Sequence, residues 1–186
     1  MTDASWHHPR ADQDGFVALE EIQDRARRLS REDFLREFPV PALLVVYRDS
    51  DGSKGGQALD PSDHGVQLLT VSIKSASVLR YLNRLAFLCK RPGNPYAHLI
   101  SVGRSHNNDI TIAVDSVSKV HGYFATEDGR WNFTDHSSTN GSLINDHELR
   151  SGQKHILQDG DVLQLGLEVT LEYHGSGSLY DRARRR

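Results

Sequence analysis

Residues 135–142 read Asp-His-Ser-Ser-Thr-Asn-Gly-Ser, a polar stretch between two short apolar runs. Asn140-Gly141 is typical of a tight turn, because both residues tolerate the left-handed backbone conformation. The flanking segments at residues 130–134 and 142–144 are short apolar runs, as short strands are. The stretch therefore predicts a loop that joins two strands and presents polar side chains on a turn.

Outward from this loop, short apolar runs recur through the second half of the chain. They lie between glycine, asparagine, aspartate and serine residues, which punctuate strands. The further runs cover residues 97–102, 109–114, 122–126, 162–165 and 168–173. Many short strands at this spacing predict a β-sandwich or a β-barrel.

The predicted loops carry a set of hydrogen-bond donors. Gly103-Arg104 ends one apolar run, Ser118-Lys119 and His121 open another, and Thr139-Asn140-Gly141 lies between two more. Each is an ordinary turn or surface residue when taken singly. Together, a planar guanidinium, an ammonium group and two hydroxyls are the donors that a dianionic phosphate requires.

Four elements of the sequence resemble the forkhead-associated (FHA) family, over roughly residues 80–174. They are Gly103-Arg104, Val-Ser-Lys-Val-His-Gly at 117–122, the stretch at 135–142, and Leu-Gln-Asp-Gly-Asp-Val-Leu-Gln-Leu-Gly at 157–166. The order and spacing are those of the family, and residues 107–110 also fit. The resemblance implies an all-β fold, an FHA-type β-sandwich of two antiparallel sheets, preceded by a small N-terminal α/β extension.

The resemblance also assigns roles to residues of this chain. It implies that Arg104 and Ser118 hold a phosphate, that Lys119 replaces the family's arginine or asparagine, that Thr139 lines a pocket for the threonine methyl, and that Asn140 binds the peptide backbone. The expected loop-bracing residues are Gly103, His121, Gly141 and Asn145.

Three positions depart from the family pattern. Lys119 stands for arginine, Gly122 for alanine and Ser142 for threonine. Lysine keeps the positive charge but loses the planar, two-pronged geometry of a guanidinium. The other two departures are expected to affect packing rather than ligand contact.

The sequence predicts four segments: a disordered tail (1–15), a helical and strand extension (16–79), the FHA domain (80–174) and a flexible basic tail (175–186). In the extension, apolar residues at three- and four-residue steps from residue 16 to 29 predict an amphipathic helix. Ser30 is expected to cap a second helix, which Pro39 and Pro41 end. Strands are expected at 42–48 and 66–74, joined by a flexible loop at 49–56, whereas 78–88 is ambiguous between helix and strand.

Composition and motifs argue against catalysis and against a cofactor. The 186 residues carry a formal net charge of −3 and a single cysteine, Cys89, which excludes an intrachain disulfide and predicts a reducing, cytoplasmic location. No Walker loop, dinucleotide fingerprint, HExxH or nucleophile elbow is present, and the ten histidines are too scattered to predict a metal site. No apolar stretch approaches the length of a membrane span.

The resemblance implies a phosphothreonine-binding adaptor whose partner is a protein phosphorylated by a Ser/Thr kinase. A phosphate-independent interaction scaffold on the same fold is the alternative. Binding of nucleic acid through the basic tail is expected to be weak or absent, because only four arginines gather there without a stacking surface. Thr2, the only threonine of the predicted N-terminal tail, is a hypothetical autoregulatory phosphorylation site.

Overall fold

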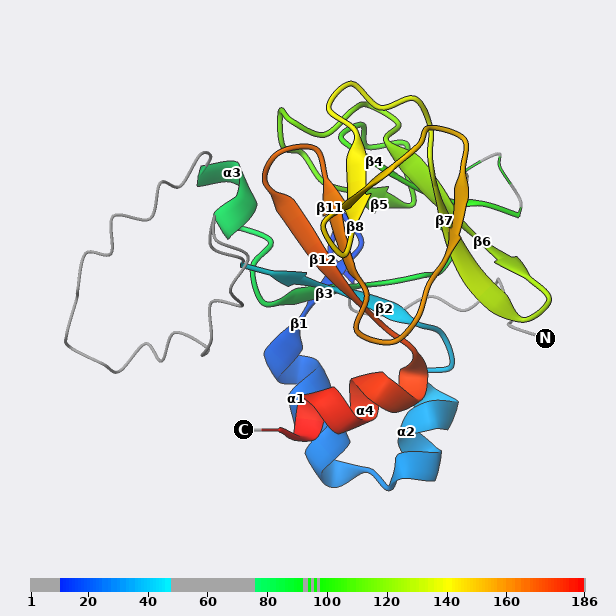
Figure 1. The fold of residues 1–186 in the computed structure, drawn as a ribbon. Helices are drawn as coiled ribbons and strands as arrows, with labels where there is room; N and C mark the ends of the chain where they lie inside the picture. The colour runs from blue at the N-terminus through cyan, green and yellow to red at the C-terminus, as the bar shows by residue number, and fades with distance from the viewer. Residues whose placement is uncertain (1–10, 48–75, 92–93, 95, 97, 186) are drawn as a thin grey trace.

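The computed structural model describes residues 11–47, 76–91, 94, 96 and 98–185. The expected strand at 66–74, the expected loop at 49–56 and Thr2 lie outside these residues. Within them, strands dominate, and the helices other than one short helix at residues 76–79 gather at one end of the molecule (Figure 1). No helix in the described part of the chain is both long and apolar enough to cross a membrane.

The strands form two sheets. The first has seven strands, in the order β1 (Phe16–Ala18), β3 (Arg84–Phe87), β2 (Ala42–Val46), β12 (Val169–His174), β11 (Val162–Leu165), β8 (Ser142–Ile144) and β9 (His147–Leu149). The second has five, in the order β10 (Lys154–Ile156), β7 (Arg130–Asp135), β6 (Gly122–Glu127), β4 (Ile100–Gly103) and β5 (Ile110–Thr111). Every strand pair is antiparallel except β4 with β5. The prediction of two largely antiparallel sheets is confirmed.

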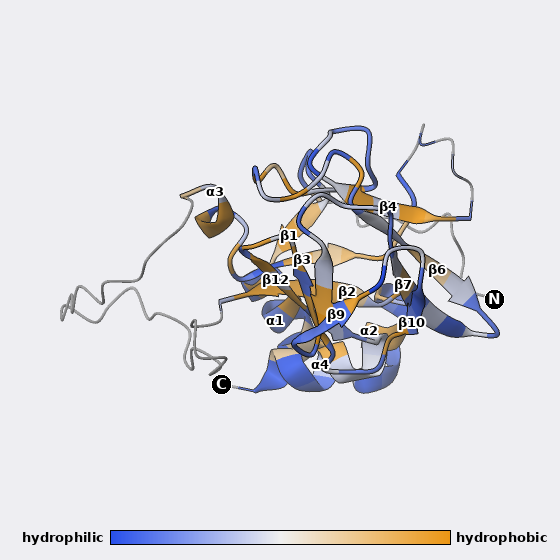
Figure 2. Ribbon diagram, turned by 45° about the horizontal axis from the view of Figure 1, so that its top comes forward, coloured by the Kyte–Doolittle hydropathy of each residue, from blue (hydrophilic) through white to orange (hydrophobic). Residues whose placement is uncertain are grey.

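The two sheets enclose one apolar core. Val102, Phe124 and Phe133 from the five-stranded sheet share this core with Leu163 and Leu171 from the other, and all five side chains are fully buried. Figure 2 shows apolar residues along the central strands. Burial of a large apolar side chain contributes about 1.5 to 3 kcal/mol, so this core is the main stabilising element of the sandwich.

Strands from the first half of the chain form part of the seven-stranded sheet. β2 pairs with β12 over five residues, from Ala42 opposite His174 to Val46 opposite Thr170, and β1 and β3 continue the sheet beyond it. The segment expected as an extension therefore supplies two strands, β1 and β2, of the seven-stranded sheet. The ambiguous region 78–88 resolves into both alternatives, a short helix α3 (Ala76–Leu79) followed by β3.

Three helices cover the outer face of the seven-stranded sheet: α1 (Leu19–Arg28), α2 (Arg31–Glu37) and α4 (Ser176–Arg184). The prediction that the first helix begins near Phe16 is wrong, because Phe16 and Val17 pair with β3. The predicted cap of the second helix is confirmed: the Asp33 amide donates to Ser30 Oγ at 3.1 Å. This helix ends at Glu37, two residues before Pro39.

The prediction of a flexible tail from residue 175 is wrong. Residues 176–184 form α4, whose Leu179, Tyr180 and Ala183 are buried in a second apolar cluster with Phe34 of α2 and Ile22 of α1. This burial offsets the weak helix propensity of Gly177 and the serines. The prediction of a disordered tail does not hold for Asp14, which is buried and accepts a hydrogen bond from Arg80.

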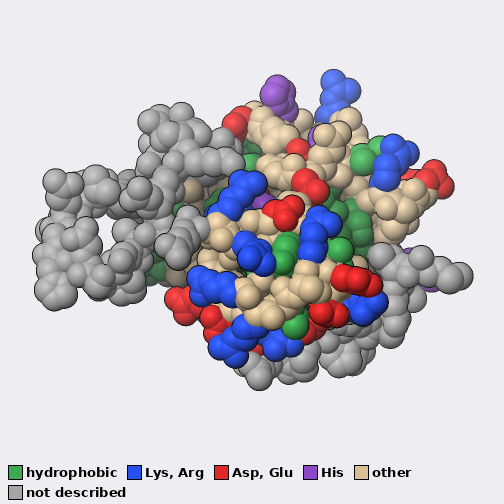
Figure 3. Space-filling model, turned by 90° about the horizontal axis from the view of Figure 1, so that it is seen from below, with side chains coloured by type: hydrophobic (Ala, Val, Ile, Leu, Met, Phe, Trp, Pro, Cys, Tyr) green, Lys and Arg blue, Asp and Glu red, His purple; other side chains and the backbone are tan. Residues whose placement is uncertain are grey.

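The outer surface of these helices carries both signs of charge. Arg25 pairs with Glu37, Arg31 with Asp181, and Arg36 with Glu32. Figure 3, which views this end of the molecule, shows lysine and arginine side chains interleaved with aspartate and glutamate. Such a mixed surface lacks the continuous basic field that attracts nucleic acid.

Candidate functional site

Loops that follow β4 and precede β6 and β8 enclose a surface depression of about 550 Å³. In Figure 1 these loops lie at the top of the sandwich, at the opposite end from α1, α2 and α4. The depression is lined by Arg104, Asp115, Ser116, Val117, Ser118, Lys119, Val120, Ser137, Thr139 and Asn140. The structure thus brings together the five residues that the sequence predicts as ligand contacts, from three separate regions at 104, 118–119 and 139–140.

Arg104 is held by its backbone and by the stem of its side chain. Its amide donates to the Ser118 carbonyl at 2.8 Å, and its Nε donates to the Val117 carbonyl at 3.2 Å. The side chain remains 42% exposed, and Nη1 lies 4.0 Å from Asp115 Oδ1. The guanidinium is therefore positioned at the edge of the depression, where it can donate further hydrogen bonds to an anion.

Gly103 makes this position possible. A Cβ atom there would lie 2.5 Å from the Lys119 carbonyl oxygen, closer than any real contact. Only glycine allows the two backbones to approach, so the requirement concerns space rather than an unusual φ angle. Gly122 has a similar explanation, because its Cβ would lie 2.5 Å from Phe133 Cζ, and this accounts for glycine where the family has alanine.

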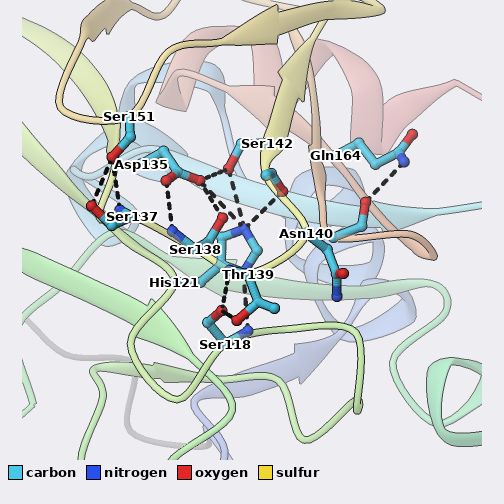
Figure 4. Close-up of polar contacts among 12 residues, drawn as sticks. Ser118, His121, Asp135, Ser137, Ser138, Thr139, Asn140, Ser142, Ser151 and Gln164 are labelled. Atoms are coloured by element: carbon cyan, nitrogen blue, oxygen red, sulfur yellow. Dashed lines mark hydrogen bonds and ion pairs between the residues drawn. The ribbon is translucent and has the colours of Figure 1, made fainter.

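Ser118 and Thr139 join the two sides of the depression. The Thr139 amide donates to Ser118 Oγ at 2.9 Å, and Ser118 Oγ donates to Thr139 Oγ1 at 3.3 Å (Figure 4). The Ser118 amide donates to Nδ1 of His121 at 3.1 Å. The imidazole therefore contacts the backbone of Ser118 and not its hydroxyl, which is not the arrangement of a nucleophile and its general base.

His121 lies beneath these loops and is fully buried. Because Nδ1 accepts a hydrogen bond, Nε2 carries the proton and donates to the Gly141 carbonyl and to Ser142 Oγ, both at 3.2 Å. Burial lowers the pKa of His121, although Asp135 and the Gly141 carbonyl oppose this shift. Both nitrogens of the imidazole are therefore hydrogen-bonded, and the ring links the Ser118 backbone to the Gly141–Ser142 turn.

Asp135 completes the network below the depression. Its carboxylate accepts hydrogen bonds from the amide and hydroxyl of Ser138 at 2.9 and 2.6 Å, and from the hydroxyl of Ser142 at 2.6 Å. Burial raises the pKa of Asp135, but these hydrogen bonds outweigh burial and lower it overall. The carboxylate thus fixes the turn that carries Thr139 and Asn140.

Asn140 and Gly141 form the far side of the depression. Asn140 Nδ2 donates to the Ser116 carbonyl at 2.9 Å, which leaves the second amide hydrogen and the amide oxygen for other partners. Gly141 has a φ of 73°, which favours glycine, and its carbonyl accepts from the Gly166 amide at 3.0 Å. The turn is therefore tied both to the loop before β6 and to the end of β11.

Asn145 braces a different turn from the one beside the depression. It follows β8, whereas Gly141 precedes it. Its Nδ2 donates to Asp161 Oδ1 at 2.8 Å, and its Oδ1 accepts from the Val162 amide at 3.0 Å. These contacts attach the β8–β9 turn to β11.

Several functional positions are not evident from sequence reasoning. Asn108 is buried and its Nδ2 donates to the carbonyls of Ser105 and Lys119, both at 2.7 Å. The sequence indicates Asn108 only as part of the family-like stretch at 107–110. Asp135 and Ser142 belong to the family-like stretch at 135–142, yet only the fold shows that they form one network with His121. The other lining residues without a predicted role are Asp115, Ser116, Val117, Val120 and Ser137.

Comparison with known proteins identifies the region that contains the depression. Residues 100–166 match the model of the FHA domain family. The glycogen accumulation regulator GarA of Mycobacterium tuberculosis is 28% identical over 147 residues, which cover 79% of this chain and 78% of GarA. An uncharacterized protein of Mycobacterium bovis matches with the same figures.

Solved structures of FHA proteins also align with the chain. One is EmbR of Mycobacterium tuberculosis in complex with a low-affinity phosphopeptide, with 25% identity, a TM-score of 0.38 and 41% of this chain covered. The match spans 20% of the EmbR chain. Another is the FHA domain of an Arabidopsis thaliana hypothetical protein, with 22% identity, a TM-score of 0.46, and 73% and 85% of the two chains covered. Residues 100–166 of this chain are therefore similar to the FHA domain family.

Proposed function

We propose that this protein is a non-catalytic adaptor that binds a phosphothreonine of a protein phosphorylated by a Ser/Thr kinase. One observation carries the proposal: Arg104, Ser118, Lys119, Thr139 and Asn140 line a single open depression. These side chains supply cationic and neutral donors of the kind that bind a phosphate dianion. The similarity to GarA, which is named as a regulator, supports a regulatory role. The single cysteine accords with a cytoplasmic location.

In the proposed complex, each side chain has a separate role. Arg104 donates to the phosphate from the edge of the depression, and Ser118 and Lys119 donate beside it. Asn140 binds the peptide backbone with the donor and acceptor that Ser116 leaves available. About three charge-assisted hydrogen bonds at roughly 1.5 to 3 kcal/mol each contribute about 4.5 to 9 kcal/mol before the entropy of association is subtracted. A micromolar affinity corresponds to about 8 kcal/mol, so other contacts with the peptide must supply the rest.

Discrimination against phosphoserine would come from the threonine methyl. The phosphate contacts are the same for both residues, so they contribute no preference. Thr139 and Val120 line the depression and offer methyl groups to the peptide side chain. Burial of one methyl group is worth roughly 1 to 3 kcal/mol, which corresponds to about a 10- to 200-fold preference.

Titration calorimetry tests the proposal with three forms of one peptide, chosen by an oriented phosphothreonine library. The forms carry threonine, phosphoserine or phosphothreonine, and the measurement is made at about pH 7.5, where the phosphate is a dianion. We expect binding in the order phosphothreonine, phosphoserine, threonine. Equal affinity for the unphosphorylated form would instead support a phosphate-independent scaffold, and equal affinity for the two phosphorylated forms would exclude a methyl pocket.

A further inference from the structure

Asp115 is an acidic side chain in the depression proposed to bind a phosphate. It lines the depression, its side chain is fully exposed, and its Oδ1 lies 4.0 Å from Nη1 of Arg104. A carboxylate so placed repels a phosphate dianion, and phosphate binding by Arg104 and Lys119 does not require it. Its presence therefore needs a different account.

Charge balance shows when the carboxylate becomes unpaired. Without a ligand, the positive charge of Arg104 partly compensates the negative charge of Asp115. When a phosphate dianion binds, its two negative charges offset those of Arg104 and Lys119, and the charge of Asp115 is left without compensation. A cationic side chain on the peptide restores the balance, whereas an acidic one worsens it.

The location of Asp115 indicates where this cation would be on the peptide. Residues 115–118 run along the depression between the proposed phosphate anchor and the proposed backbone contact. Arg104 Nε donates to the Val117 carbonyl, and Asn140 Nδ2 donates to the Ser116 carbonyl. A peptide that extends from Arg104 to Asn140 passes beside this segment, so residues that flank the phosphothreonine come within reach of Asp115.

We propose that Asp115 is a specificity-determining residue that selects phosphothreonine peptides with a lysine or arginine next to the phosphothreonine. The inference rests on the proposed phosphothreonine binding and adds the chemical class of peptide. A simpler role for Asp115 is to hold Arg104 in place. That role affects all phosphopeptides equally, whereas charge selection depends on the flanking residue.

The test uses short synthetic phosphothreonine peptides that differ only by lysine, alanine or glutamate at each flanking position in turn. Binding is measured by calorimetry for the wild-type chain, for Asp115→Asn and for Asp128→Asn as control. Asp128 is exposed in the β6–β7 turn, at the far end of β6 from His121, and asparagine tolerates its φ of 49°. Both variants remove one negative charge, but only one removes it from the depression.

For the wild type and for Asp128→Asn, we expect the lysine peptide to bind about 1.5- to 5-fold more tightly than the alanine peptide, as exposed ion pairs do. This preference should weaken as salt is added. In Asp115→Asn it should vanish or reverse, because Arg104 and Lys119 then face the flanking residue alone. A lysine preference that persists in Asp115→Asn, or an equal loss of affinity for all three peptides, would overturn the inference and leave the proposed function intact. Failure of the wild type to bind any phosphorylated peptide would overturn both.

Discussion

The two ends of this sandwich are stabilised by different interactions. At the helix-covered end, the buried rings of Phe38 and Tyr180 pack on the buried ring of Phe34. Their centroids lie 4.6 and 5.2 Å, respectively, from the Phe34 centroid. At the loop end, the buried groups are polar: His121, Asp135 and Ser142 satisfy one another through hydrogen bonds. Apolar burial at the first end is non-directional, whereas the hydrogen bonds of the polar network require every partner in place.

This difference separates stability from recognition. The helix-covered end carries paired surface charges and lies away from the depression. The loop end presents its donors on short turns supported by the buried network. Substitutions at the helix-covered end should therefore change unfolding alone, and those at the loop end should change binding with or without unfolding.

Phe34→Ala should produce the largest effect on stability. The side chain is fully buried among Phe38 and Tyr180, so its loss leaves a cavity that costs about 3 to 5 kcal/mol. Urea denaturation measures this loss, and calorimetry on the folded fraction should show unchanged phosphopeptide affinity. Leu79→Ala, at a side chain 47% exposed in α3, is the control and should change stability by less than about 0.5 kcal/mol. A marked loss of affinity in folded Phe34→Ala would mean that the two ends are coupled.

Arg104→Ala should have the converse effect. We expect phosphopeptide binding to weaken by about 2 to 4 kcal/mol with little change in melting temperature, because the guanidinium is half-exposed and acts on the ligand. Arg104→Lys is the matched variant, because it keeps the charge without the planar donor geometry. Its phosphopeptide affinity should lie between those of the wild type and Arg104→Ala. Near-normal affinity in folded Arg104→Ala would remove this residue from the proposed site.

His121→Ala should lower both stability and affinity, because it leaves the Ser118 amide without its acceptor and removes a donor to the Gly141 carbonyl and to Ser142 Oγ. The expected cost is about 1 to 3 kcal/mol. Burial lowers the pKa of His121 in the folded state, so the unfolded chain binds this proton at higher pH than the folded chain does. The stabilisation from neutral His121 is therefore complete above about pH 6.5 and is lost as pH falls toward the lowered value.

Thermal unfolding of the wild type and of His121→Ala across this pH range isolates the contribution. The difference between the two melting temperatures should shrink as the solution becomes more acidic. His98→Ala, at an exposed histidine, serves as the control. A difference that stays constant with pH would show that protonation of His121 is not linked to folding.

Gly141→Ala should have the smallest effect. Its φ of 73° is unfavourable for alanine, and open space surrounds the added methyl, so the expected cost is about 1 to 2 kcal/mol. Gly160→Ala places the same strain, at a φ of 86°, in the turn before β11. The two variants should lose similar stability, but only Gly141→Ala should also weaken phosphopeptide binding, because it shifts Asn140. Equal phosphopeptide affinities of Gly141→Ala and Gly160→Ala would indicate that the turn tolerates this shift.

Local sequence signals are sufficient for much of the fold. Ser30 is followed by an acidic pair and an apolar run, and the cap forms as the pattern predicts. Similarly, the short runs between turn residues correspond to β4, β6, β7, β8, β11 and β12. The strands β9 and β10 were not predicted, because His147–Leu149 and Lys154–Ile156 are three-residue edge strands with mostly exposed side chains.

Long-range contacts account for what the sequence does not show. Gly175 to Ser178 have the composition of a linker, and α4 exists because α1 and α2 cover its apolar side. In the same way, the order of the sequence motifs indicates that Arg104, Ser118 and Asn140 belong to loops. It does not indicate that Asp115 faces Arg104, or that Asp135, Ser142 and His121 form one network, since those contacts depend on how separate loops meet.

The pairing of β2 with β12 has a consequence for the order of events during synthesis. The two strands are more than 120 residues apart along the chain, yet they are neighbours in the sheet. While a ribosome produces the chain from its N-terminus, Leu43 and Val45 emerge long before Leu171 and Tyr173. The sheet can close only after β12 has emerged, so β2 remains without this neighbour while the intervening residues are synthesised.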